Sequence, residues 1–151
     1  MPTSNLRRQG LIGLLGAIAL AALSLTPAAF AQTPQASVRP KVVLQMSESD
    51  PAKWNLALNN VRNVQADLGA GNVDVEVVAY GPGIGMLLAN SVVSPRLEEA
   101  LAAGVKVVAC ENTMKGQKLA RKDMTDGIGY VQAGVVELIQ KQQQGYAYIR
   151  P

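Results

Sequence analysis

Short aliphatic runs separated by helix-like segments occupy most of this 151-residue chain. Residues 41–46 (KVVLQM) and 105–110 (VKVVAC) are rich in β-branched side chains, which predicts two buried strands. Residues 73–80 (VDVEVVAY) begin with alternating apolar and acidic side chains, which predicts a strand covered on one face and placed near a sheet edge. Shorter runs at 130–131 and 146–149 predict two further strands.

Helices are predicted in the intervals between these strands. Asp50 is a favourable N-cap residue and Pro51 fits the first helical position, so one helix begins there. Apolar residues then recur three or four positions apart until Gly69 and Gly71 end the pattern. The other helical segments are 86–89, 94–104, a basic segment at about 116–122 that follows a loop, and about 135–144.

Strands that alternate with helices favour right-handed βαβ units and a mostly parallel sheet. We therefore expect an α/β protein: a three-layer α/β/α sandwich with a sheet of about five strands and a flavodoxin-like appearance. The chain contains no internal repeat and no sign of a second globular domain.

The first segment of the chain has the layout of a secretory signal peptide. Arg7 and Arg8 precede residues 11–25, which carry no charge, and the small residues of 29–31 (AFA) form a cleavage site before Gln32. The apolar run is shorter than the ~20 residues that span a bilayer. We predict a signal peptide at 1–31, a linker at 32–40 and one domain at 41–151, in a periplasmic protein without membrane attachment after cleavage. An uncleaved anchor is the alternative, and the export route, Sec or twin-arginine, stays open.

Composition excludes several kinds of chemistry. The chain has no histidine and one cysteine, which excludes a Ser-His-Asp triad, a Cys-His pair, an internal disulfide and a zinc cluster of thiolates. We expect no metal site and no cofactor. Removing the leader with its two arginines leaves 12 basic and 11 acidic side chains, so nucleic-acid binding is not expected either.

Cys110 is the first candidate functional residue. It ends a predicted parallel strand, and open α/β sheets bind their ligands at that end of the strands. The N–H groups of the segment that follows, with Lys115 near, would favour a thiolate, whereas Glu111 would oppose it. The alternative is a buried cysteine that acts as a small hydrophobic residue. Position alone leaves both interpretations open.

Three other clusters could serve such a site or merely shape the surface. Residues 81–85 (GPGIG) follow another strand, and their glycines allow a ligand to approach the backbone or form a plain turn. Asn55, Asn59 and Asn63 are spaced four residues apart and so lie along one side of the predicted helix, with Asn60 beside them. Asparagine is unfavourable in a helix, which suggests that these side-chain amides make contacts. The third cluster consists of four basic side chains, Lys115, Lys118, Arg121 and Lys122. They could attract an anionic sulfur species or an acidic partner, or they could form a solvated face.

Several segments together resemble the DsrE/DsrF-like superfamily, and its exported branch in particular. They are residues 107–114 (VVACENTM), 80–83 (YGPG), 54–60 (WNLALNN) and 145–148 (GYAY). The resemblance covers about residues 41–151 and implies an α/β/α sandwich that assembles into trimers or hexamers. It also implies that Cys110 carries sulfur as a persulfide. Asn112, Thr113, Gly81, Gly83 and Asn60 are then candidates for binding the sulfur species.

Our first hypothesis is an exported sulfur-trafficking protein in which Cys110 is the covalent sulfur acceptor and donor. Such a protein is a carrier, or resembles a sulfurtransferase, and exchanges sulfur with a partner protein or a small sulfur species. The alternative is a non-catalytic subunit of regulatory function that binds a small ligand and in which the cysteine is incidental. A thiol peroxidase or reductase is less favoured, because the chain has no second cysteine and no histidine.

Overall fold

The computed structural model describes residues 39–151, which form one parallel sheet of five strands in the order β4-β3-β2-β1-β5. All four strand pairs are parallel. The predicted signal peptide and nearly all of the predicted linker lie outside the described residues. The strands are β1 (Lys41–Met46), β2 (Asp74–Ala79), β3 (Lys106–Cys110), β4 (Gly129–Val131) and β5 (Ala147–Ile149).

Four α-helices and three short 3₁₀ helices connect these strands. At the start of α1, the Asp50 carboxylate accepts a hydrogen bond from the Ala52 N–H at 2.8 Å, as its N-cap position predicts. The α-helices are α1 (Pro51–Leu68), α2 (Ser94–Ala102), α3 (Glu111–Gly116) and α4 (Gly134–Gln143). The 3₁₀ helices are η1 (Ala70–Asn72), η2 (Gly81–Leu87) and η3 (Arg121–Asp123).

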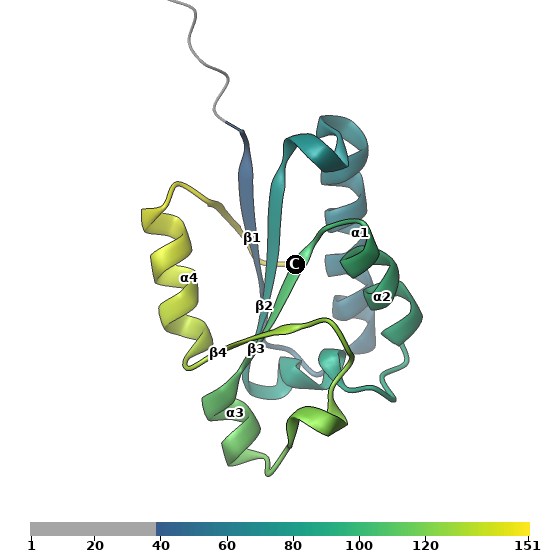
Figure 1. Ribbon diagram of the computed structural model, residues 1–151, viewed down its shortest axis with the longest axis vertical. Coiled ribbons are helices and arrows are strands. Elements are labelled where there is room, and N and C mark those ends of the chain that lie inside the picture. Colours follow the sequence, from purple (N-terminus) through teal and green to yellow (C-terminus); the bar gives the residue numbers. More distant parts are fainter. Residues whose placement is uncertain (1–38) are drawn as a thin grey trace, which may run out of the picture. The chain divides into compact units, whose positions relative to one another are not determined.

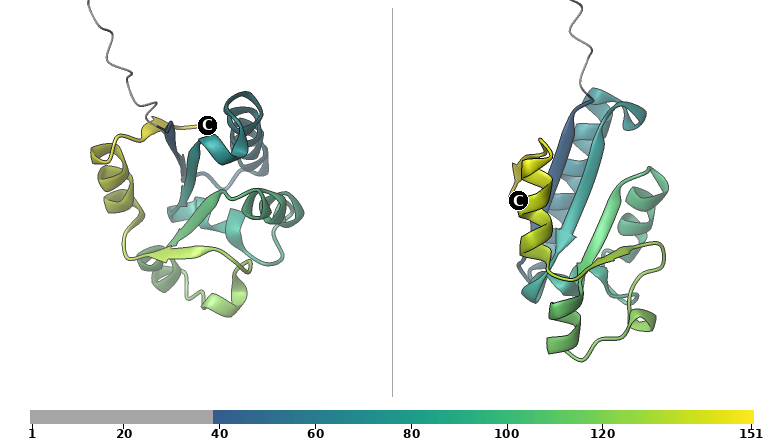
Figure 2. Two further views of the ribbon diagram at one scale, coloured as in Figure 1. Left: turned by 45° about the horizontal axis from the view of Figure 1, so that its top comes forward. Right: turned by 60° about the vertical axis from the view of Figure 1, so that its left-hand side comes forward.

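The helices lie on both faces of the sheet, which confirms the three-layer α/β/α fold. Helices α1 and α2 cover one face and α4 covers the other (Figures 1 and 2). Alternate residues of each strand face the two layers. Leu44 and Val77 belong to the large core on the α1 and α2 side, whereas Val43 and Val78 pack with Leu138 of α4. No helix within residues 39–151 has the length and apolar character needed to cross a membrane.

Strand β2 corrects one expectation. It lies at the centre of the sheet and not near an edge. Its acidic residue Glu76 is only 2% exposed and faces α4, where the Lys141 ammonium lies 2.6 Å from the Glu76 carboxylate. The alternating pattern suggested water on that face, but a cation from a helix distant in sequence takes the place of water.

The segment after β3 corrects a second expectation. Helix α3 begins directly at Glu111, and no single helix spans 116–122, where α3 ends at Gly116 and the 3₁₀ helix η3 begins only at Arg121. Gly116 ends α3, and Lys118 then adopts a positive φ of 56°, which is incompatible with a continuing α-helix. The short helical segment predicted at 86–89 is also displaced, because the 3₁₀ helix η2 covers residues 81–87. The remaining strands and α-helices lie within a residue or two of their predicted positions, and the 3₁₀ helix η1 had no predicted counterpart.

Candidate functional site

Cys110 is the last residue of β3. After β3 and after the neighbouring strand β4, the chain turns to opposite faces of the sheet. From β3 the chain enters α3, whose Met114 belongs to the core on the α1 and α2 side. From the adjacent strand β4 the chain enters α4, on the opposite face (Figure 1). Such a divergence between neighbouring parallel strands is where open α/β sheets bind ligands. The topology therefore places Cys110 at the expected binding position of the fold.

The Cys110 sulfur lies at the first turns of two helices. Cys110 is the N-cap residue of α3, and Gly134 is the first residue of α4. Burial by itself raises the pKa of the Cys110 thiol, but hydrogen bonds to the sulfur from the Thr113 hydroxyl and from the N–H groups of Gly134, Thr113 and Asn112 outweigh it. The net pKa lies below that of an ordinary thiol, because these donors stabilise the thiolate.

Thr113 links the sulfur to the glycine loop that follows β2. Its Oγ1 accepts a hydrogen bond from the Gly81 N–H at 2.9 Å, which leaves the hydroxyl proton for the Cys110 sulfur. The Gly81 carbonyl in turn accepts a hydrogen bond from Nε2 of Gln117 at 3.1 Å. The cysteine segment and the glycine loop, 32 residues apart at Gly81 and Thr113, thus form one hydrogen-bonded unit.

Gln132 closes the other side of the site and was not among the predicted residues. Its carbonyl lies 3.9 Å from the Cys110 sulfur and accepts the Asn112 N–H at 3.2 Å. Its side-chain Nε2 donates to Oδ1 of Asn112 at 2.8 Å. Its position directly after the predicted strand at 130–131 could have identified it, because the carboxyl ends of neighbouring parallel strands lie side by side.

Close packing brings the start of α4 to the sulfur. A Cβ added to Gly134 would lie 3.1 Å from Cβ of Tyr80, at the end of β2. Only a residue without a side chain fits there without displacement. Glycine therefore lets the first N–H of α4 approach the carboxyl ends of the central strands.

Two predicted site residues lie apart from this cluster. Gly83 is buried against β1, where an added Cβ would meet the Met46 carbonyl oxygen at 2.4 Å, so its visible role is packing. Asn60 lies on α1 and makes no side-chain hydrogen bond within the described part of the chain. The asparagines at 55 and 59 contact Arg96 of α2. The structure thus brings together Cys110 and Thr113 with the Asn112 and Gly81 backbones.

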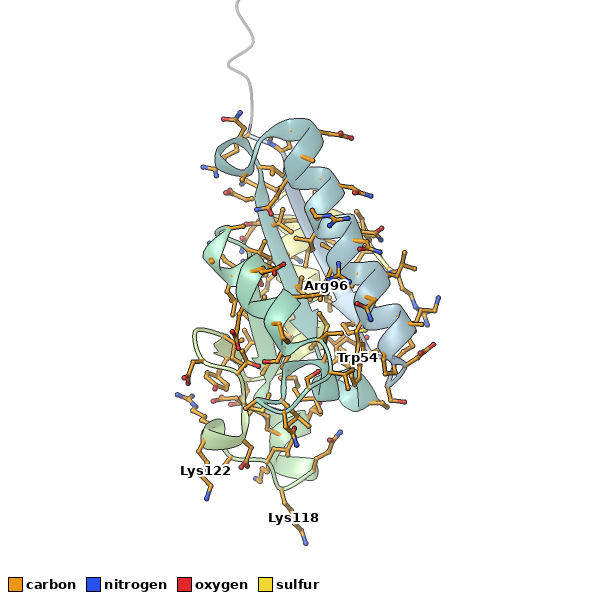
Figure 3. The ribbon with its side chains drawn as sticks, turned by 90° about the vertical axis from the view of Figure 1, so that its right-hand side faces the viewer. Trp54, Arg96, Lys118 and Lys122 are labelled. Carbon is orange, nitrogen blue, oxygen red and sulfur yellow. The ribbon has the colours of Figure 1, made fainter. Side chains whose placement is uncertain are left out.

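The charges beside the site are mostly turned outward. Glu111, which would oppose a thiolate, is paired with Arg121 at 2.6 Å, and the Arg121 guanidinium stacks on the Tyr130 ring at 4.2 Å. Lys118 and Lys122 project from the end of the molecule into solvent (Figure 3). These two lysines therefore do not contact the sulfur, and the groups that lower the Cys110 pKa are hydrogen-bond donors.

Access to the sulfur is narrow. Cys110 is 6% exposed in the single chain, so only a slim reagent reaches it without a local movement. Within residues 39–151 no group of three acidic, cysteine or histidine side chains is arranged to hold a metal ion. What the residues can do is stabilise a thiolate and the developing negative charge on a neighbouring sulfur atom.

Comparisons with known proteins identify the family and the fold. The model of the DsrE/DsrF-like family matches residues 29–151. A protein of unknown function from Methanobacterium thermoautotrophicum, MTH1491, is 37% identical and has a TM-score of 0.71, over 74% of this chain and 99% of that one. The ychN protein of E. coli has a TM-score of 0.60 with 18% identity, over 74% and 99% of the two chains, and shows likeness of fold alone. No curated protein matches the chain.

Proposed function

Because this chain belongs to the DsrE/DsrF-like family, which is associated with sulfur relay, we propose that it carries sulfane sulfur on Cys110. The observation that supports this role most strongly is the set of donors around the Cys110 sulfur. The Thr113 hydroxyl and three backbone N–H groups favour the thiolate, which is the nucleophilic form of cysteine.

The proposed loading step is a thiol exchange. The Cys110 thiolate attacks the terminal sulfur of a donor persulfide, R–S–SH, and the S–S bond of the donor breaks. The donor leaves as the thiolate R–S⁻, and Cys110 becomes Cys–S–SH, which releases its proton to water. The transferred sulfur atom keeps its oxidation state, so no external oxidant is needed.

Discharge is the reverse exchange with another thiol. An acceptor thiolate attacks the outer sulfur, and the Cys110 thiolate leaves with the bonding electron pair. The donors that stabilise the Cys110 thiolate also make it a good leaving group, which suits a carrier. Because Cys110 is 6% exposed, we expect small persulfides and inorganic polysulfide to load it faster than bulky donors.

Intact mass spectrometry tests the loading step. Incubation with inorganic polysulfide is expected to add the mass of one or more sulfur atoms to the protein and none to the Cys110→Ser variant. Tetrathionate is expected to add one thiosulfate group to the same residue. An unmodified protein after exposure to both reagents, under conditions that modify free cysteine, would overturn the proposal.

We also propose that the carrier works in the periplasm after removal of residues 1–31. The support is the tripartite leader, with its charged start, apolar run and small-residue cleavage site. Fractionation of the producing cell, followed by N-terminal sequencing, is expected to find the protein in the periplasm beginning at Gln32. Recovery of the full-length chain from the membrane would favour the uncleaved anchor instead.

Self-association, into a trimer or a hexamer, is part of the same proposal. Among residues 39–151, helix α4 alone covers its face of the sheet (Figure 1), and three of its aliphatic side chains face water. Val135, Val136 and Ile139 are 53%, 49% and 50% exposed. Exposed large apolar side chains that gather on one helix are typical of an interface between protein chains.

The alternative function is a binding or regulatory subunit in which the cysteine is incidental. The low exposure of Cys110 favours this reading. It predicts that Cys110→Ala leaves the biological function intact, whereas substitution of Gly81 or Asn112 does not. The sulfur-carrier proposal predicts that Cys110→Ala abolishes the function.

A further inference from the structure

A cavity of about 210 Å³ lies between α1 and α2, on the face of the sheet that these helices cover. None of the residues that line it belongs to the Cys110 cluster. Leu58 and Val61 of α1 and Ala100 of α2 contribute an apolar floor. Because the side chain of Ala100 is small, it leaves space that a larger residue would fill. The two helices therefore do not pack tightly at the cavity.

Two cross-helix bridges hold the helices at the ends of this cavity. At one end the Arg96 guanidinium reaches from α2 to α1, where it donates to the side-chain oxygens of Asn55 and Asn59, the latter at 2.7 Å. Figure 3 shows Arg96 lying between the two helices. At the other end Nε2 of Gln65 donates to the Ala103 carbonyl at 2.9 Å. Two asparagines that are costly for α1 are thereby used to place a cation.

Within the described residues, 39–151, Arg96 has no counter-ion. Its partners on α1 are neutral amide groups, and among residues 39–151 no carboxylate lies within 4.0 Å of Arg96 or of Arg62, which also lines the cavity. A partly buried cation without a negative partner is unfavourable, because it loses hydration and gains little in return. Three of its contacts go to Asn55 and Asn59, so some of its five N–H groups are left for a ligand.

The charge and size of the cavity restrict what it can hold. Two arginines and Glu99 line it, which leaves one net positive charge and favours a monoanion over a dianion. Its volume is below the ~300–1,000 Å³ of pockets for drug-sized ligands. A planar carboxylate matches the fork of a guanidinium, and an apolar chain matches the floor.

We propose that the cavity between α1 and α2 binds a small carboxylate with a short apolar chain. The carboxylate contacts Arg96, with Arg62 beside it, and the chain lies over Leu58, Val61 and Ala100. This site is separate from Cys110, and the proposal does not depend on sulfur transfer.

Titration of the isotope-labelled protein with hexanoate, followed by amide NMR spectra, tests the proposal. We expect saturable shifts confined to residues 58–65 and 96–103. Arg96→Gln is expected to weaken binding about tenfold or more, which corresponds to about 1.4 kcal/mol. Arg39→Gln removes one positive charge from a residue that does not line the cavity and is the matched control, with unchanged affinity. Hexan-1-ol, which has the same chain and no charge, is expected to bind at least tenfold more weakly than hexanoate.

A second variant guards against a folding defect of Arg96→Gln. Ala100→Leu fills the floor and leaves both cross-helix bridges in place, so it is expected to abolish hexanoate binding in a folded protein. The proposal is overturned if hexanoate gives no saturable shifts, or if its shifts are scattered over the surface. It is equally overturned if the alcohol binds as well as the acid, or if Ala100→Leu binds hexanoate like the unmodified protein. Loading of Cys110 by polysulfide is a separate readout that none of these outcomes changes.

Discussion

At the scale of single residues, hydrogen-bond donors lower the pKa of the Cys110 thiol. Among these donors, Thr113 contributes a side-chain hydroxyl that lowers the Cys110 pKa. The same hydroxyl oxygen accepts the Gly81 N–H. One side chain therefore couples the glycine loop to the ionisation of the sulfur, which makes it the natural target for mutation.

Replacing Thr113 by valine is expected to raise the pKa of the Cys110 thiol. The lowered pKa means that the thiolate forms at a lower pH than in an ordinary thiol, whose pKa is about 8.5. Loss of the hydroxyl moves the midpoint of thiol alkylation upward and slows alkylation several-fold near neutral pH. The rate of iodoacetamide reaction as a function of pH measures this shift. Thr113→Ser keeps the hydroxyl and should retain the original midpoint; equal profiles for both variants and the unmodified protein would refute the assignment.

Gly83 provides a second residue-scale prediction, which concerns stability. Alanine there would place its Cβ 2.4 Å from the Met46 carbonyl oxygen, a backbone atom that cannot turn away. We expect Gly83→Ala to lower the free energy of unfolding by about 1–3 kcal/mol. Gly116→Ala is the control, because a Cβ there meets nothing within 4 Å. Urea unfolding of both variants measures the difference, and equal stabilities would show that the η2 turn shifts freely.

At the scale of elements, α4 is joined to the centre of the sheet by a buried charge cluster. The Lys141 ammonium lies 2.6 Å from Glu76 of β2 and 3.4 Å from Glu137 of α4 itself. The second Glu76 oxygen is buried without a hydrogen-bond partner. Burial raises the pKa of Glu76, Lys141 opposes that rise, and Glu137 adds to it. Two carboxylates thus share one cation beneath the helix.

Removing that cation is expected to be more harmful than removing the buried acid. Lys141→Met leaves two adjacent carboxylates without a cation and should cost about 3–5 kcal/mol at neutral pH. Glu76→Gln removes the desolvated charge and leaves Lys141 paired with Glu137, so its cost should be smaller.

Because the pKa of Glu76 is raised on folding, its protonation stabilises the folded state at low pH, and this contribution is lost as pH rises through the folded pKa. The Lys141→Met variant should therefore regain stability as pH falls towards 5, and a loss of stability over that range in urea unfolding would contradict this account.

Elements also show what the sequence could and could not predict. The β-branched runs at 41–46 and 105–110 identified their strands almost to the residue, because buried parallel strands are continuous apolar runs. Helix α3 was missed since its six residues carry no helical repeat of their own. The central place of β2 was missed because the cation that neutralises Glu76 comes from a helix 65 residues later.

The candidate site was predictable only in part for the same reason. Cys110 and Thr113 were identified from their place after a strand and from resemblance to a family. Gln132 and the first N–H of α4 join them only through the order of strands β3 and β4 and through the crossover to the opposite face. Which strands are neighbours is a property of packing between distant segments, and no local pattern encodes it.

At the scale of the whole molecule, the exposed side of α4 is expected to hold the subunits of an oligomer together. Ile139→Glu places a charge on this surface without touching the core, since Ile139 is 50% exposed. We expect it to shift the protein to monomers in light scattering coupled to size-exclusion chromatography. Val92, which is 76% exposed outside α4, offers the matched control Val92→Glu. A monomeric unmodified protein, or an oligomer that survives Ile139→Glu, would contradict the role of α4.

In the proposed function, one thiolate at the carboxyl end of β3 both accepts and releases a sulfur atom. The most direct measurement loads the protein with polysulfide, removes the excess, adds cyanide as a sulfur acceptor, and follows both the intact mass and the thiocyanate formed. We expect that the added mass disappears, that each sulfur atom lost appears as one thiocyanate, and that Cys110→Ser yields none. A protein that takes up no sulfur, or that keeps it in the presence of cyanide, would refute the sulfur-carrier proposal.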